Sequence, residues 1–233
     1  MTNTYIALDL ETTGLNPKQD KIIEIGAVKV MEGRVVEEYG TFINPGRKLE
    51  ERIVELTGIR QEDLEGAPYM EEVLDEVLTF LGDEPLLGHQ LLFDYACLKR
   101  AAVNGKRSFE KKGMDTLKIA RKYLPELEQR RLGYLCEYYG IPHRAHRALD
   151  DARATHELYQ HLVASFYKED DKLFVPIPLQ YTVKRDTPAT KAQKERLYRL
   201  IEQHKLDLNL DVERLTRSEA SRITDKILSA NGH

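Results

Sequence analysis

The chain has 233 residues, of which 41% are apolar and 32% are charged, enough for one well-packed core with a small addition. These proportions exclude disordered and collagen-like proteins. The 35 Lys and Arg residues stand against 39 Asp and Glu residues, and the formal net charge of −4 argues against a protein that grips nucleic acid through bulk positive charge alone.

The first part of the chain has the pattern of strands. Three runs rich in β-branched, aromatic and aliphatic residues cover 5–10, 21–30 and 34–43, and turn-forming residues separate them. Because the connections are short, the three runs predict an antiparallel meander.

Helical patterns dominate after Pro68. Apolar residues recur at helical spacing over 73–81, and a short apolar run at 85–88 follows them. Further helices are expected at about 92–104, 115–124, 131–139 and 148–166. Early strands followed by alternating strands and helices predict an α/β domain with a mixed sheet.

The composition changes near Phe174, because the Val-Pro-Ile-Pro-Leu segment at 175–179 cannot continue a helix. We therefore expect a first domain over 1–172, a linker over 173–187 and a two-helix C-terminal appendage over 188–233. A section of about 45 residues is too small to fold securely alone, so we expect the appendage to dock on the first domain or on a partner.

Two capping boxes mark the starts of the appendage helices, Thr190 with Gln193 and Thr216 with Glu219. Residues 172–233 carry a formal charge of +4, which leaves −8 for residues 1–171. The acidity of the chain therefore belongs to the first domain. The basic residues of the appendage would either lie on a solvated helix face or contact a nucleic-acid backbone.

No stretch approaches the ~20 apolar residues of a membrane span, and the N-terminus lacks the basic and apolar regions of a signal peptide. Cys97 and Cys136 are the only cysteines, too few for a disulfide scaffold and without zinc-site spacing. We expect a cytoplasmic protein with no membrane part.

An acidic pair, Asp9 and Glu11, stands at the end of the most apolar N-terminal run. The period of two in a strand places both carboxylates on one face, where they repel each other unless a cation lies between them or one holds a proton. The alternative is the exposed face of an edge strand. The apolar surroundings and the Thr12-Thr13-Gly14 turn that follows favour a site on a central strand.

Two further acidic segments lie far along the chain. Asp94 follows His89 at an expected strand-to-helix junction, and alone it is typical of a helix N-cap. An acidic pair, Asp150 and Asp151, opens the helix expected at 148–166, shortly after His143 and His146. By itself that pair is typical of carboxylates that complement a helix dipole.

Together the three segments resemble the three motifs of the DnaQ-like, DEDDh-type 3′→5′ exonucleases. Asp9-Leu10-Glu11-Thr12-Thr13-Gly14 matches the first motif and His89-Gln90-Leu91-Leu92-Phe93-Asp94 the second. The third motif has a histidine five positions before an aspartate that alanine follows, which selects His146 and Asp151 and passes over His143 and Asp150. The resemblance covers about residues 4–166, and in this order the motifs are highly specific. One departure is Gln90, where family members usually carry asparagine.

The resemblance implies an α/β, ribonuclease-H-like fold with a mixed five-stranded sheet flanked by helices, plus the small helical appendage. It implies that Asp9, Glu11, Asp94 and Asp151 bind two divalent cations, Mg²⁺ or Mn²⁺, which suit oxygen ligands. Such a pair of ions can activate water and stabilise the leaving 3′-oxygen. His146 would be the general base.

The same resemblance implies substrate contacts near the first two motifs, at Leu10, Thr12, Thr13, Leu15, His89 and Phe93. Leu15 and Phe93 match an apolar wedge and a stacking platform for the last bases, with ordinary core packing as the alternative. The expected activity is metal-dependent 3′→5′ release of nucleoside 5′-monophosphates from single-stranded nucleic acid, with DNA in replication or repair favoured over RNA.

Other functions stay open at this point. They are an exoribonuclease that trims RNA 3′ ends, a non-catalytic nucleic-acid-binding module on the same fold, and a metal-dependent phosphatase or endonuclease. The intact set of acids argues against the non-catalytic module. A polymerase or another replication or repair protein could bind through the C-terminal helices.

Overall fold

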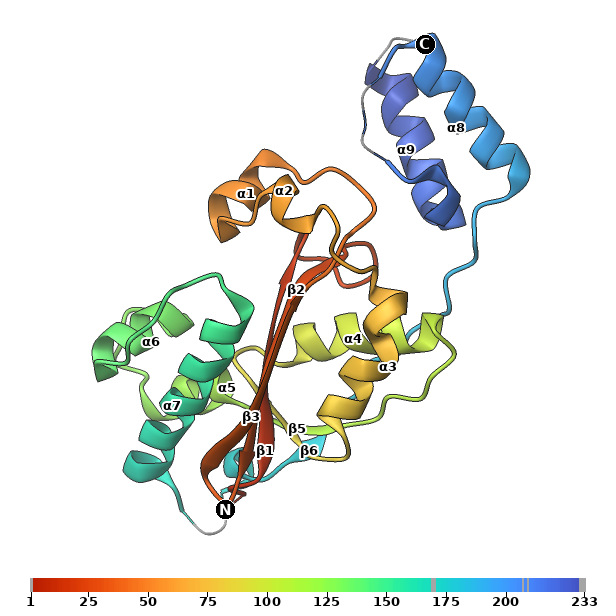
Figure 1. Ribbon diagram of the computed structural model, residues 1–233. Helices are drawn as coiled ribbons and strands as arrows, with labels where there is room; N and C mark the ends of the chain where they lie inside the picture. Colours follow the sequence, from red (N-terminus) through yellow and green to blue (C-terminus); the bar gives the residue numbers. More distant parts are fainter. Residues whose placement is uncertain (1, 169–170, 207, 209, 231–233) are drawn as a thin grey trace.

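A mixed six-stranded sheet forms the centre of the molecule in the computed structural model, which describes residues 2–168, 171–206, 208 and 210–230 (Figure 1). The strand order is β3-β2-β1-β4-β5-β6. The strands are β1 (Tyr5–Thr12), β2 (Ile22–Met31), β3 (Arg34–Phe42), β4 (Leu86–Gly88), β5 (Lys112–Asp115) and β6 (Ile177–Pro178). The first three strands form the expected antiparallel meander, and β4 and β5 run parallel to β1.

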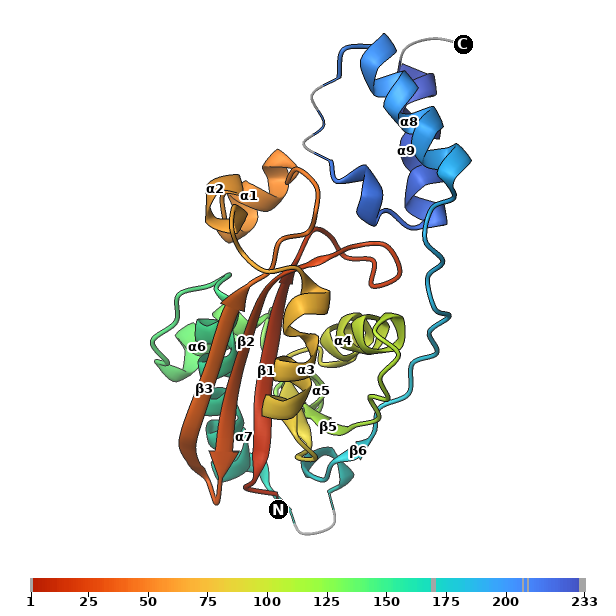
Figure 2. The ribbon, with the colours of Figure 1, turned by 45° about the vertical axis from the view of Figure 1, so that its right-hand side comes forward.

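Helices cover both faces of this sheet (Figures 1 and 2). One face packs against α5 (Thr116–Tyr123), α6 (Leu132–Tyr139) and α7 (Ala148–Phe166). The other packs against α3 (Met70–Leu81) and α4 (Leu92–Asn104). Two short helices, α1 (Glu51–Thr57) and α2 (Gln61–Leu64), form a small cluster around Ile23. The α/β fold class expected from the sequence is confirmed.

Strand β1 is buried on both of its faces. Ile6, Leu8 and Leu10 belong to the core under α3 and α4, whereas Tyr5 and Ala7 belong to the core under α7. The alternation therefore places Asp9 and Glu11 on the face that α7 covers. Because β1 lies between β2 and β4, the acidic pair is on a central strand, and the edge-strand alternative is wrong.

The sheet has one strand more than the five that the sequence led us to expect. The additional strand β6 lies inside the segment 173–187 that we expected to be a linker, and it pairs antiparallel with β5. A proline is tolerated there because β6 is an edge strand, where one side of the backbone needs no partner. Phe174 is fully buried in the core under α7. We therefore propose that the first domain extends through Leu179 and that the linker is shorter.

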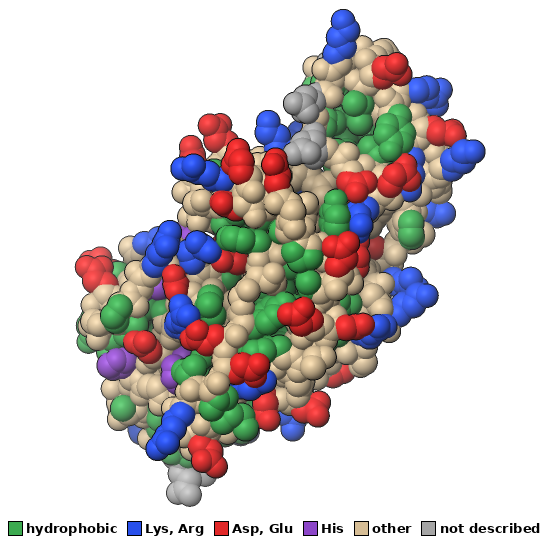
Figure 3. Space-filling view, viewed as in Figure 1, with side chains coloured by type: hydrophobic (Ala, Val, Ile, Leu, Met, Phe, Trp, Pro, Cys, Tyr) green, Lys and Arg blue, Asp and Glu red, His purple; other side chains and the backbone are tan. Residues whose placement is uncertain are grey.

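The C-terminal appendage consists of α8 (Lys191–Gln203) and α9 (Arg217–Ala230), which share a small apolar core of their own. Both capping boxes are formed. Figures 1 and 2 show the two helices set apart from the sheet and joined to it by an extended segment. Lys and Arg side chains, with Asp and Glu among them, follow the outer edge of α8 in Figure 3.

Candidate active site

Three elements bring carboxylates together beside the end of β1. One carboxylate oxygen from each of Asp9, Glu11 and Asp151 lies within 4.8 Å of the others. Asp94, in the first turn of α4, is buried beside Asp9, whose ionisation it opposes. The first-motif and third-motif acids thus form one cluster across 142 positions of sequence, with the second-motif acid next to it.

Burial and repulsion from neighbouring acids make Asp9, Glu11 and Asp94 hard to ionise. Burial, followed by the charges of Asp94 and Asp151, holds the pKa of Asp9 well above its ordinary value. Burial also raises the pKa of Asp94 well above its ordinary value. For Glu11, burial and then the charges of Asp151 and Glu24 raise the pKa to about 8. Without a cation, the cluster therefore retains protons near neutral pH.

Gly26 allows α7 to approach the sheet closely enough for Asp151 to reach the cluster. Gly26 pairs with Asp9 in the β1–β2 ladder. A Cβ atom at this position would lie 2.1 Å from the carbonyl carbon of Ala148, in the first turn of α7. Any larger residue would push the start of α7, and Asp151 with it, away from the strand.

Glu24 fixes the same helix start by hydrogen bonds. Its Oε1 accepts from Nη2 of Arg147 at 3.0 Å, and its Oε2 accepts from the backbone N–H of Ala148 at 3.1 Å. Glu24 lies opposite Glu11 in the ladder and adds to the negative potential there. Sequence reasoning assigned Glu24 no role, although a lone charge inside an apolar strand indicates a buried, partnered side chain.

Both histidines of the third segment contact Asp151. The backbone N–H of His146 donates to Asp151 Oδ2 at 2.9 Å, and His143 Nε2 lies against Asp151 Oδ1. The His146 imidazole is 47% exposed, with Nδ1 4.0 Å from Glu11 Oε1, whereas the His143 side chain is only 8% exposed. His146 therefore stands at the solvent edge of the cluster, and His143 is a buried partner of Asp151 that motif spacing alone passed over.

His89 connects the second motif by hydrogen bonds to residues outside it. The ring nitrogens of His89 face the Thr116 hydroxyl at 2.9 Å and the Arg130 carbonyl at 2.8 Å, and burial lowers the pKa of the imidazole. Gln90 has a φ of 72°, a region that asparagine adopts more readily than glutamine. This backbone conformation gives a physical reason why asparagine would suit this position better than glutamine.

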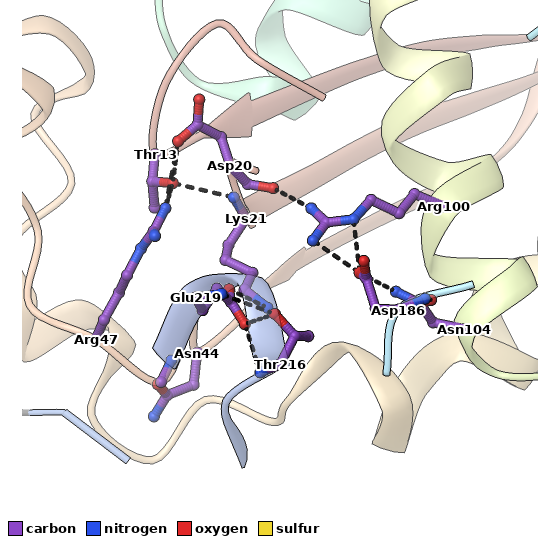
Figure 4. A network of polar contacts seen from close by, with 11 residues as sticks. Thr13, Asp20, Lys21, Asn44, Arg47, Arg100, Asn104, Asp186, Thr216 and Glu219 are labelled. Carbon is purple, nitrogen blue, oxygen red and sulfur yellow. Dashed lines mark hydrogen bonds and ion pairs between the residues drawn. The ribbon is translucent and has the colours of Figure 1, made fainter. Parts of the chain in front are cut away.

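The remaining substrate-contact candidates differ in accessibility. Leu15 is 89% exposed, which excludes core packing for it, while Phe93 packs partly against the core under α3 and α4. Leu10 is buried, so only its backbone can meet a ligand. The hydroxyls of Thr12 and Thr13 are both in hydrogen bonds, the first with the Gly14 carbonyl and the second with Asp20 (Figure 4).

The donor set fits a hard divalent cation. The three groups close enough to share one ion are all carboxylates, and oxygen ligands suit Mg²⁺, Mn²⁺ or Ca²⁺ better than they suit soft metals. The two cysteines are buried elsewhere, on α4 and α6. A cation would also offset the repulsion that, after burial, raises the pKa values of Asp9, Glu11 and Asp94.

The chain is similar to known exonucleases. A family model described as Exonuclease, RNase_T, matches residues 6–159. The chain is 44% identical over 168 residues to the PolC-type DNA polymerase III of Thermotoga maritima, which covers 71% of this chain and 12% of that protein. It is 36% identical over 162 residues to the DNA polymerase III subunit epsilon of Aquifex aeolicus, which covers 68% of this chain and 80% of that protein.

Among solved structures, exonuclease X in complex with 5′ overhanging duplex DNA has the same fold. The TM-score is 0.58 at 23% identity, covering 70% of this chain and 94% of that chain. This chain thus spans 11–17% of the length of the PolC relatives, but most of the Aquifex aeolicus subunit and of exonuclease X. None of the described helices is long and apolar enough to cross a membrane.

The repulsion within the cluster predicts that Asp9→Asn stabilises the metal-free protein. Removing one buried acid should raise Tm, by about 2–4 °C for each kcal/mol gained in a chain of this size. Mg²⁺ or Mn²⁺ should raise the Tm of the wild type, because a cation binds only the folded site, and the variant should lose most of that increase. Thermal melts with and without metal measure both effects.

Asp150→Asn is the matched control, since Asp150 is the neighbouring acid and pairs with Arg153 at 2.9 Å on the surface. It should leave the metal response intact. An Asp9→Asn variant that melts lower than the wild type without metal, or responds to metal as the wild type does, would contradict the assignment.

Proposed function

Because this chain belongs to the DnaQ-like exonuclease family, we propose that it hydrolyses single-stranded nucleic acid from the 3′ end and releases nucleoside 5′-monophosphates. The observation that carries the proposal is the convergence of Asp9, Glu11 and Asp151 within 4.8 Å, with Asp94 buried beside them. These are the four acids that the family motifs select. An intact acid set favours an enzyme over a binding module that has lost its activity.

The four acids would hold two divalent cations, Mg²⁺ or Mn²⁺. Bound there, such ions supply Lewis-acid activation of water and stabilise negative charge on the leaving 3′-oxygen. The protein contributes the placement of the carboxylates. Strand β1 supplies Asp9 and Glu11 from one face, and the first turns of α4 and α7 supply Asp94 and Asp151.

His146 would take the proton from the attacking water. An imidazole is suited to proton transfer near neutral pH, and a general base must reach the water directly. The His146 side chain is half-exposed at the edge of the cluster, 4.0 Å from Glu11, so it can turn toward a water held by the acids. His143 is buried against Asp151 and would orient that carboxylate rather than exchange protons with substrate.

The loop after β1 would bind the terminal nucleotide. Leu15 offers an exposed apolar side chain against which a base can stack, and base stacking is worth ~1–3 kcal/mol and tolerates any sequence. The relatives named as DNA polymerase III and the neighbour in complex with DNA favour a DNA strand over RNA. They also support a role in replication or repair, with a polymerase as a candidate partner of the C-terminal helices.

A cleavage assay tests the proposal directly. Single-stranded DNA, duplex DNA and single-stranded RNA, each labelled at the 5′ end, are incubated with the protein and Mg²⁺ and resolved on a gel. We expect stepwise shortening of single-stranded DNA that chelator abolishes, and loss of activity in Asp151→Ala but not in Asp150→Ala. Internal cuts, or full activity in a folded Asp151→Ala variant, would contradict the proposal. Faster shortening of RNA than of DNA would instead identify the protein as an exoribonuclease.

The general base gives a separate prediction. His146→Ala should reduce kcat by ~10²–10⁴, the usual contribution of a positioned acid–base group. His161→Ala is the control, because His161 stacks on Tyr139 and touches none of the acids in the described structure. Single-turnover rates on a short oligonucleotide separate the chemical step from product release. If His143→Ala loses more activity than His146→Ala, the assignment of the general base to His146 is wrong.

A further inference from the structure

The loop between β1 and β2, residues 13–21, is organised around Asp20 (Figure 4). The Thr13 hydroxyl donates to Asp20 Oδ1 at 3.3 Å, and the backbone N–H of Asn16 donates to Asp20 Oδ2 at 2.9 Å. Arg47 pairs with the same carboxylate at 3.3 Å and also contacts the Thr13 hydroxyl. These contacts fix the base of the loop that carries Leu15.

One end of this loop is tied to the C-terminal appendage. The backbone N–H of Lys21 donates to the Thr13 hydroxyl oxygen at 3.0 Å, and the backbone N–H of Thr13 donates to the Lys21 carbonyl at 2.9 Å. The side chain of Lys21 reaches the other way, with Nζ 3.0 Å from Oε1 of Glu219 in α9. Lys21 thus contacts both Thr13, a candidate substrate-binding residue, and Glu219 of the appendage.

The appendage side of this contact is buried. The Glu219 side chain is only 4% exposed. Burial alone would raise the pKa of Glu219, but the Lys21 charge and the Thr216 hydrogen bonds lower it overall. The second oxygen, Oε2, accepts from the Thr216 backbone N–H at 2.9 Å and completes the α9 capping box. One oxygen of Glu219 therefore caps its own helix, and the other binds Lys21 of the loop.

Arg100 of α4 forms a second connection between the loop and the C-terminal part of the chain. Its Nη1 donates to the Asp20 backbone carbonyl at 3.1 Å, and its Nε donates to Asp186 Oδ2 at 2.9 Å. Asn104 holds Asp186 from both sides, by its amide at 2.8 Å and by its carbonyl at 2.9 Å. Asp186 lies in the segment that leads into α8, and only 9% of the Arg100 surface is exposed.

Other ion pairs of the appendage are more exposed, and one of them, between Arg214 and Glu71 of α3, also joins the appendage to the first domain. Lys194 and Glu213 form an exposed pair within the appendage itself, and exposed pairs contribute little to stability. Buried pairs carry a desolvation penalty that offsets their attraction, so they fix geometry more than they add stability. In Lys21–Glu219 and in Arg100–Asp186 one side chain is at most 10% exposed, and both pairs connect the appendage or its linker to the loop after β1.

We propose that the C-terminal appendage and the linker before it are positioning elements for the 3′-end-binding loop, and that they act through Glu219 and Asp186 respectively. By holding Lys21 and Arg100, they keep Thr13 and Leu15 in the conformation that receives the terminal nucleotide. The inference rests on the proposed function for its consequence in catalysis, whereas the restraint on the loop is independent of it.

Glu219→Gln isolates this role, because glutamine keeps the capping box but removes the charge that holds Lys21. We expect KM for a single-stranded oligonucleotide to rise about 5–10-fold with kcat changed less than about twofold, because the coupled loop binds less well but the acids are untouched. In the absence of metal and substrate, amide hydrogens of residues 13–21 should exchange faster in the variant. Glu213→Gln, which breaks the exposed pair within the appendage, should change neither quantity.

A double-mutant cycle with Lys21→Gln guards against an indirect effect. The single and double variants should show similar KM values, because either change removes the same interaction. Unchanged exchange in the loop, additive effects in the cycle, or an equal effect of Glu213→Gln would overturn the proposal. If the wild-type protein cleaves no oligonucleotide, the proposed function fails, and the exchange measurement alone decides whether the appendage restrains the loop.

Discussion

Repulsion between buried carboxylates is the constraint around which this structure is arranged. Acids from β1, α4 and α7 converge in one place, and burial and their neighbours raise the pKa values of Asp9, Glu11 and Asp94. Such an arrangement weakens the metal-free fold, so the rest of the protein must hold the acids in place. A divalent cation reverses the sign of the interaction, because each charge that opposes its neighbours then attracts the ion.

Several features hold this arrangement together without touching a substrate. Gly26 lets the first turn of α7 lie against the sheet, and Glu24 fixes that turn through Arg147 and Ala148. The backbone of His146 and the ring of His143 engage the two oxygens of Asp151. The loop that follows β1 is connected through Lys21 and Arg100 to the C-terminal segment. Rigid placement of this kind is what a site for charged ligands requires.

Much of this could be predicted from local patterns. The meander, the bounds of α4 and α7 and the two capping boxes follow from periodicity and from the residues at element ends, and the structure has them. The four acids were selected by motif spacing, and the fold brings carboxylate oxygens of three of them within 4.8 Å of one another and places the fourth acid beside them. What escaped prediction depends on long-range packing. A two-residue edge strand such as β6 has no periodicity to detect, and the contact of Glu219 with Lys21 joins positions 198 residues apart. His143 was passed over because motif spacing describes chain positions and does not report which side chains turn inward.

The central claim is that Asp9, Glu11, Asp94 and Asp151 together form a divalent-cation site. Crystals of the protein soaked in Mn²⁺ with a nucleoside 5′-monophosphate, measured at a wavelength where manganese scatters anomalously, test it most directly. The account predicts two anomalous peaks among these four carboxylates and their loss in crystals of Asp9→Asn. Well-ordered crystals of the wild type with no peak at the cluster, or with manganese bound only elsewhere on the surface, would contradict it.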